Sequence, residues 1–213
     1  GRALWAALCT VCSTGLRKSE IARTSAEETR PIAMRSSLRY RIGGRLLDSP
    51  TVAELRAMGP GDVAILTPPP SKADQFGTIW GASPIYLAWG REERNACRAL
   101  VAMEIADPVA GLARLRTPLF SPGAERPFTG HALDDVLQRM LRSFLPEAQA
   151  ALYSWHSGRI YLACALKAAG ATGGQIQAMC RWVSEQSLHI YARMNETTYT
   201  YWVRQALLGR QGQ

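Results

Sequence analysis

The sequence predicts an α+β fold, a mostly helical domain that carries one small antiparallel β-sheet. Two patterns support this prediction. Apolar residues recur at helical spacing near the start of the chain and over most of the chain beyond residue 92, whereas between about residues 36 and 90 they form short alternating runs. With 213 residues, 47% of them hydrophobic and 20% charged, the chain is long enough to bury a sizeable core.

The N-terminal part predicts two helical segments. Residues 2–13 (RALWAALCTVCS) form an apolar run typical of a buried helix, which Gly15 breaks. Helical spacing resumes over residues 16–23 (LRKSEIAR). The chain begins with Gly1 inside an apolar segment, so we expect it to be a piece of a longer protein.

The sheet is expected between about residues 36 and 90. Over residues 38–42 apolar side chains alternate with arginines, and Gly43-Gly44 follows, which predicts a β-hairpin. In residues 51–58, Thr51 and Glu54 have the spacing of a capping box, which predicts a short helix. The remaining segments of this region are expected to be a strand at 62–67, a turn at 68–74 and a further strand region at 78–89.

The rest of the chain predicts helices. Residues 107–128 hold four prolines and are expected to form a loop between two of these helices. The expected helices are 92–106, 129–144, 156–169, 173–181, 184–191 and 196–208. We expect the whole chain, residues 1–213, to form one domain.

The formal net charge of +8 favours a polyanionic partner. Lysine is nearly absent: Lys18, Lys72 and Lys167 are the only lysines among 25 basic residues. Arginine suits bidentate recognition of phosphate, although a codon bias would give the same count. No apolar run approaches the roughly 20 residues that span a bilayer, so no membrane partner is expected.

The five cysteines form no convincing metal site. Cys9 and Cys12 make a C-x-x-C pair inside an apolar helical run, and no second pair completes a zinc site. We expect free thiols and neither a metal nor another cofactor.

Residues scattered along the chain could serve an anion site, although each has a plainer interpretation. His156 and Arg159 are three apart and share a helix face, or they are a capping histidine and a surface arginine. Arg17 and Glu20 have the same spacing and could form only a surface ion pair. Lys72 lies in a Pro-rich turn and could be an ordinary solvated lysine.

Two aromatic residues complete the set. Trp182 carries an N–H donor but could belong to the core, and Tyr191 lies between polar residues but could be a packing tyrosine. Tyr199 and Tyr201 compete with Tyr191 for any role.

The order Arg, Lys, His-x-x-Arg, Trp, Tyr resembles the catalytic domain of the tyrosine recombinase (phage integrase) family, and the tryptophan makes it similar to Cre-like members. The stretch LRKSEIAR resembles the family's first arginine box. The spacings from His156 to Arg159, Trp182 and Tyr191 are those of Cre-like members, which sets the two later tyrosines aside.

The resemblance implies a mechanism for DNA strand exchange. Arg17 and Arg159 would clamp a scissile phosphate, and Trp182 would add a donor where most members carry a second histidine. Tyr191 would attack phosphorus with help from His156, giving a 3′-phosphotyrosyl link. The remaining two residues are Lys72, which would protonate the departing 5′ oxygen, and Glu20, which would orient these groups. Neither ATP nor metal is needed.

The chain departs from the family pattern in three places. Arg17 and Lys72 are separated by a longer stretch than compact bacterial members use, Arg181 stands where glycine is common, and the N-terminal core-binding domain is absent. In the family, a tail such as residues 192–213 often docks into a neighbouring protomer. The resemblance thus implies tetramers on double-stranded DNA, whereas packing of the tail on its own domain is the alternative.

Two other functions stay open. A type IB topoisomerase-like or telomere-resolving enzyme shares the fold and the tyrosine chemistry, and a DNA-binding domain without catalysis is the alternative from another class. In each case the protein is expected inside the cell with DNA, in the nucleus of a eukaryote or in the cytoplasm and nucleoid of a bacterium.

Overall fold

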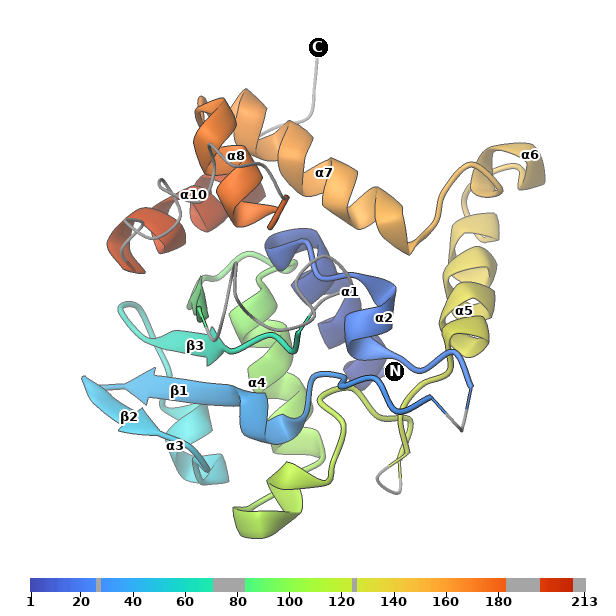
Figure 1. Cartoon of the computed structure of the whole chain (residues 1–213). Helices are drawn as coiled ribbons and strands as arrows, with labels where there is room; N and C mark the ends of the chain where they lie inside the picture. The colour runs from blue at the N-terminus through green and yellow to red at the C-terminus, as the bar shows by residue number, and fades with distance from the viewer. Residues whose placement is uncertain (26–27, 71–82, 124–125, 183–195, 209–213) are drawn as a thin grey trace.

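The fold is α+β, as the sequence predicts. The computed structural model describes residues 1–213 except 26–27, 71–82, 124–125, 183–195 and 209–213 (Figure 1). The α-helices are α1 (Arg2–Thr14), α2 (Lys18–Ile21), α3 (Val52–Arg56), α4 (Ala96–Ala106), α5 (Gly130–Arg142), α6 (Glu147–Ala150), α7 (Trp155–Ala168), α8 (Gly173–Met179) and α10 (Glu196–Leu208). The described part of the chain also contains the 3-10 helices η1 (Arg35–Ser37) and η2 (Gly111–Leu115).

In the described residues, one antiparallel sheet lies within the expected region. Its strands are β1 (Leu38–Ile42), β2 (Arg45–Leu47), β3 (Val63–Leu66) and β4 (Ile85–Ala88), in the order β2-β1-β3-β4. The β1–β2 hairpin turns at Gly43 and Gly44, whose φ values of 54° and 79° are those of a tight hairpin turn. The predicted hairpin is confirmed.

Local capping decides where several helices begin. Thr51 Oγ1 accepts the Glu54 backbone N–H at 3.2 Å, and the Glu54 carboxylate accepts the Thr51 N–H at 2.8 Å, so the predicted capping box is confirmed. The helix expected from residue 92 begins only at Ala96. The Asn95 side chain caps it, because its Oδ1 accepts the Arg98 backbone N–H at 2.9 Å.

The remaining elements largely follow the expectations. Helices 129–144, 156–169, 173–181 and 196–208 are present with shifts of two residues or fewer at each end. The segment 16–23 is helical only over α2, the loop 107–128 contains η2, and α6 was not expected. The helix expected at 184–191 lies outside the described residues.

The core forms where α1 meets α4 and α7. In Figure 1, α1 lies at the centre, with α7 above it and the sheet below and to the left. α10 packs against α7 and β4. In its contact with β4, the rings of Tyr199 and Tyr86 pack edge to face with their centroids 6.4 Å apart. The tail helix therefore rests on its own chain in this structure, and the predicted self-association on DNA remains a prediction.

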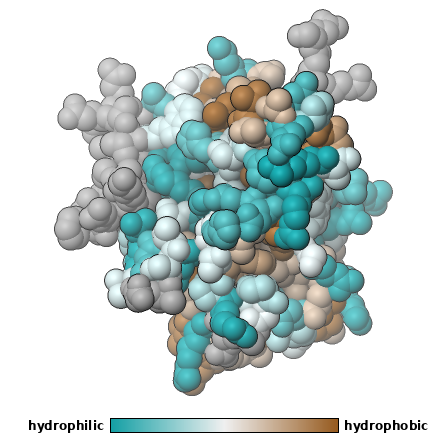
Figure 2. Space-filling model, turned by 90° about the vertical axis from the view of Figure 1, so that its right-hand side faces the viewer, coloured by the Kyte–Doolittle hydropathy of each residue, from teal (hydrophilic) through white to brown (hydrophobic). Residues whose placement is uncertain are grey.

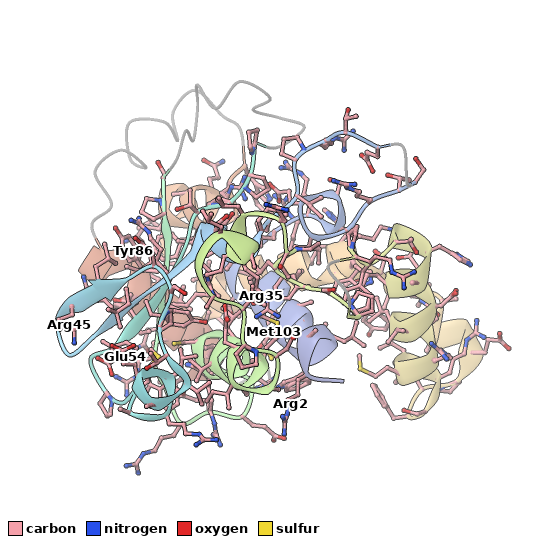
Figure 3. All side chains as sticks on the ribbon, turned by 90° about the horizontal axis from the view of Figure 1, so that it is seen from below. Arg2, Arg35, Arg45, Glu54, Tyr86 and Met103 are labelled. Carbon is pink, nitrogen blue, oxygen red and sulfur yellow. The ribbon has the colours of Figure 1, made fainter. Side chains whose placement is uncertain are left out.

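A buried ion network joins η1, α4 and η2 below the sheet. Glu104 accepts from Arg35 at 3.1 Å and from Arg114 at 3.0 Å, and Arg35 also pairs with Asp107 at 3.0 Å. Arg35 lies toward the middle of the molecule in Figure 3, whereas Arg45 lies at its edge. Two arginines meet two carboxylates here, so this network is balanced in charge and structural.

The outer surface is mixed. Figure 2 shows the side of the molecule on which α5 and α6 lie, where hydrophilic residues cover most of the face and hydrophobic ones form separate patches. Among the residues that the structure describes, no helix combines the length and apolar character needed to cross a bilayer.

Candidate anion-binding site

The loop after α1 is held against the loop after α8. Gly15 ends α1 in the left-handed conformation, with φ 62° and ψ 24°, and its N–H donates to the Val11 carbonyl at 3.0 Å. A Cβ at Gly15 would lie 3.4 Å from the Cα of Cys180. Glycine therefore serves both the turn and the close approach that brings Arg17 beside residues 180–182.

Helix α7 approaches α1 closely at Gly158. A Cβ there would lie 2.9 Å from Val11 Cγ1, a separation that real Cβ atoms do not show. The next residue, Arg159, is thereby held in the interior, where only 3% of it is exposed. Its Nη2 donates to the Cys180 carbonyl at 2.7 Å, which fixes the guanidinium at the end of α8.

Helix α8 ends in a Schellman motif. The Trp182 N–H donates to the Gln177 carbonyl at 2.9 Å, and the Arg181 N–H donates to the Ala178 carbonyl at 3.1 Å. Arg181 takes the left-handed position with φ 54°, the only positive φ of a non-glycine residue in the described ranges. Glycine is usual at this position, since a side chain there costs about 1 kcal/mol or more.

Glu20 joins the two loops. Its Oε1 accepts from Arg181 Nη2 at 2.8 Å, and its Oε2 accepts the backbone N–H of Arg17 at 2.6 Å. Only 2% of Glu20 is exposed. The interpretation of Arg17 and Glu20 as a surface ion pair is therefore wrong: the carboxylate is buried, caps α2 at Arg17 and pairs with a residue 161 positions away.

Arg17, Glu20, Arg159 and Arg181 form what we call the Glu20 cluster. Burial lowers the pKa of Arg159, and the neighbouring charge of Arg17 lowers it further, while Glu20 opposes the shift. The cluster thus holds three guanidinium groups and one carboxylate, and the ion pair within it is that of Arg181 with Glu20. The excess of positive charge distinguishes this cluster from the balanced network around Glu104.

Several donors of the Glu20 cluster are left without acceptors. In the described part of the chain, Arg17 Nη1, Arg159 Nε, and both Nε and Nη1 of Arg181 are buried and make no hydrogen bond. A buried donor without a partner costs about 1–3 kcal/mol, more when the group is charged. An oxyanion such as phosphate would supply acceptors and balance the excess charge.

The structure does not bring every predicted residue into the cluster. His156 lies in the first turn of α7 with its side chain exposed, and its backbone N–H donates to Ser154 Oγ at 3.3 Å. Trp182 directly follows Arg181 and is 38% exposed, so its side chain is not part of the core. His156 and Arg159 are three residues apart on α7, but the His156 side chain is exposed and the Arg159 side chain is buried.

Two predicted residues, Lys72 and Tyr191, lie outside the described residues. The competing tyrosines do not: Tyr199 is buried in the interface between α10 and the sheet, and Tyr201 is exposed on α10. The predicted free thiols are confirmed, with Cys9 buried and Cys12 partly buried.

Arg181 is the site residue that sequence reasoning assigned no role. The sequence feature that could have identified it is an arginine, in place of the usual glycine, at the end of a predicted helix and immediately before Trp182. Its partner Glu20 could not be read from spacing, because the ion pair joins the first and last thirds of the chain.

No group of three or more His, Cys, Asp or Glu side chains in the described ranges could hold a metal ion. A scan against models of protein families and searches of curated proteins and of solved structures found no match for this chain.

Proposed function

We propose that this protein cleaves and rejoins DNA strands through a covalent tyrosyl intermediate, as a site-specific recombinase or integrase does. The observation that carries the proposal is the Glu20 cluster, in which three arginines accompany one carboxylate, Arg159 and Arg181 are buried, and all three arginines keep buried donors without acceptors. The net charge of +8 and the predominance of arginine among the basic residues support a polyanionic substrate.

In the proposed reaction, Arg17 and Arg159 hold the non-bridging oxygens of one phosphodiester and offset the charge that builds there. The Tyr191 hydroxyl attacks phosphorus, and the bond from phosphorus to the 5′ oxygen breaks. A tyrosine with a pKa near 10 is mostly neutral at pH 7, so His156 would take its proton while Lys72 protonates the leaving oxygen.

Glu20 would position these groups, since it binds both the Arg17 backbone and Arg181. Attack by a free 5′ hydroxyl of a partner strand reverses the step, so the bond energy is conserved. The substrate would be double-stranded DNA, met inside the cell.

The test is capture of DNA by the full-length protein. A pool of nicked duplexes with randomised sequence traps the tyrosyl adduct, because the short strand beyond the nick diffuses away. We expect adducts that survive denaturation with the wild type and with Tyr201→Phe, and none with Tyr191→Phe.

Equal capture by Tyr191→Phe and the wild type would refute the nucleophile. Capture that leads only to relaxation of supercoiled DNA, with no joining of two sites, would point to a topoisomerase-like enzyme instead. Binding without any adduct would leave a DNA-binding domain.

A further inference from the structure

We infer that Arg181 is a third phosphate-binding residue of the Glu20 cluster, in addition to Arg17 and Arg159. The inference rests on the proposed function for the identity of the substrate, but its geometry stands independently of it. It assigns a binding role to a residue that the pattern of the sequence leaves without one.

The first argument is the backbone. Arg181 occupies the left-handed position of a Schellman motif, where glycine has no steric penalty. A strained residue persists when its surroundings hold it there, and such outliers concentrate at functional sites. What holds Arg181 is the side chain, since Nη2 donates to Glu20 at 2.8 Å.

The second argument is the set of donors that this ion pair leaves unused. Only Nη2 of Arg181 has a partner, whereas Nε and Nη1 are buried and make no hydrogen bond in the described part of the chain. Only 3% of the residue is exposed. Nε and Nη1 lie on different edges of the guanidinium, so each can donate a charged hydrogen bond to an anion oxygen beside the ion pair with Glu20.

The third argument is the neighbourhood. The Arg181 charge is close enough to Arg159 to contribute to the lowered pKa of that residue, after burial and the charge of Arg17. Arg159 itself is anchored on the carbonyl of Cys180, the residue before Arg181. A phosphate that binds Arg159 Nε therefore lies near the free donors of Arg181.

Glu20 has a matching role as a positioning residue. It neutralises Arg181, which lowers the cost of holding the three positive charges close together before the anion binds. Because it also caps α2 at Arg17, it ties the loop of Arg17 to that of Arg181.

The test measures phosphate binding and DNA cleavage separately. Inorganic phosphate is titrated into the full-length protein, and the unfolding midpoint is compared with that in sodium chloride of equal ionic strength. We expect phosphate to raise the unfolding midpoint of the wild type. Arg181→Met should weaken phosphate binding roughly 10- to 100-fold, because it removes charged hydrogen bonds to the anion. Arg181→Lys should keep part of the affinity.

The matched control is Arg142→Met. Arg142 is an exposed arginine that pairs with Glu147 at 3.3 Å, so the substitution removes one charge outside the cluster and should leave phosphate affinity unchanged. If Arg181→Met does not fold, Arg181→Gly replaces it, because glycine accepts the left-handed backbone.

The outcomes separate the inference from the proposed function. Phosphate affinity equal to the wild type in a folded Arg181 variant, or no phosphate effect on the wild type, overturns the inference. Phosphate binding that depends on Arg181, with no DNA adduct in the capture assay, supports the inference and rejects the proposed function. Adduct formation at the wild-type rate in Arg181→Met supports the function and rejects the inference.

Discussion

Replacing Glu20 by glutamine should destabilise the protein strongly. The carboxylate has two oxygens, one bound to Arg181 Nη2 at 2.8 Å and one to the Arg17 N–H at 2.6 Å, whereas an amide has a single acceptor. Arg181 would keep its charge in the interior without a counter-charge. Removal of one partner of a buried pair costs about 3–5 kcal/mol.

Urea unfolding followed by circular dichroism measures this loss. We expect Glu20→Gln to lower the free energy of unfolding by about 3–5 kcal/mol with the same slope against urea, and the thermal midpoint by roughly 10 °C. The control is Glu147→Gln, which breaks the exposed pair with Arg142 and should cost less than about 1 kcal/mol.

A double-mutant cycle shows whether the loss arises at Arg181. Because Arg181→Met removes the unpaired charge, the double variant Glu20→Gln, Arg181→Met should be more stable than the sum of the single losses predicts. Strict additivity, or a Glu20→Gln loss no larger than that of Glu147→Gln, would refute the buried pair as the link between the two loops.

Three further results are expected. Gly158→Ala should lower the free energy of unfolding in urea by about 1–3 kcal/mol, because the added Cβ would lie 2.9 Å from Val11 Cγ1. The control is Gly173→Ala, whose Cβ would meet nothing within 4 Å. Equal losses in the two variants would contradict the close contact of α1 and α7. Burial raises the pKa of Cys9 and of Cys97 to about 12, so at pH 8 almost none of either thiol is ionised and both should react far more slowly with iodoacetamide in the native protein than in urea. Alkylation at the rate seen in urea would contradict their burial. DNA binding measured by fluorescence anisotropy should weaken at least about tenfold between 50 and 200 mM salt, and an affinity insensitive to salt would contradict phosphate binding.

Local patterns in the sequence were sufficient where neighbouring residues decide the structure. The Thr51–Glu54 capping box and the Gly43-Gly44 hairpin depend on contacts within a few residues, and the helical spacing of residues 196–208 predicted α10. The start of α4 was missed because the Asn95 cap competes with the helix-forming residues before it, and such competition is settled by tertiary packing.

The candidate site could be predicted only in part. Arg17, Glu20 and Arg159 were chosen from their order along the chain, and the structure brings them together through α1, α2 and α7. The pairing of Glu20 with Arg181 depends on the packing of Gly15 against Cys180. The periodicity of the sequence does not show such a contact between distant loops.

We propose that Tyr191 acts on a phosphate held by the Glu20 cluster. Mass spectrometry of the proteolysed DNA adduct is the sharpest test, because it identifies the residue that carries the nucleotide. We expect the nucleotide to be attached to the peptide that contains Tyr191. Attachment to Tyr199 or Tyr201, or the absence of any nucleotide-bearing tyrosine, would contradict it.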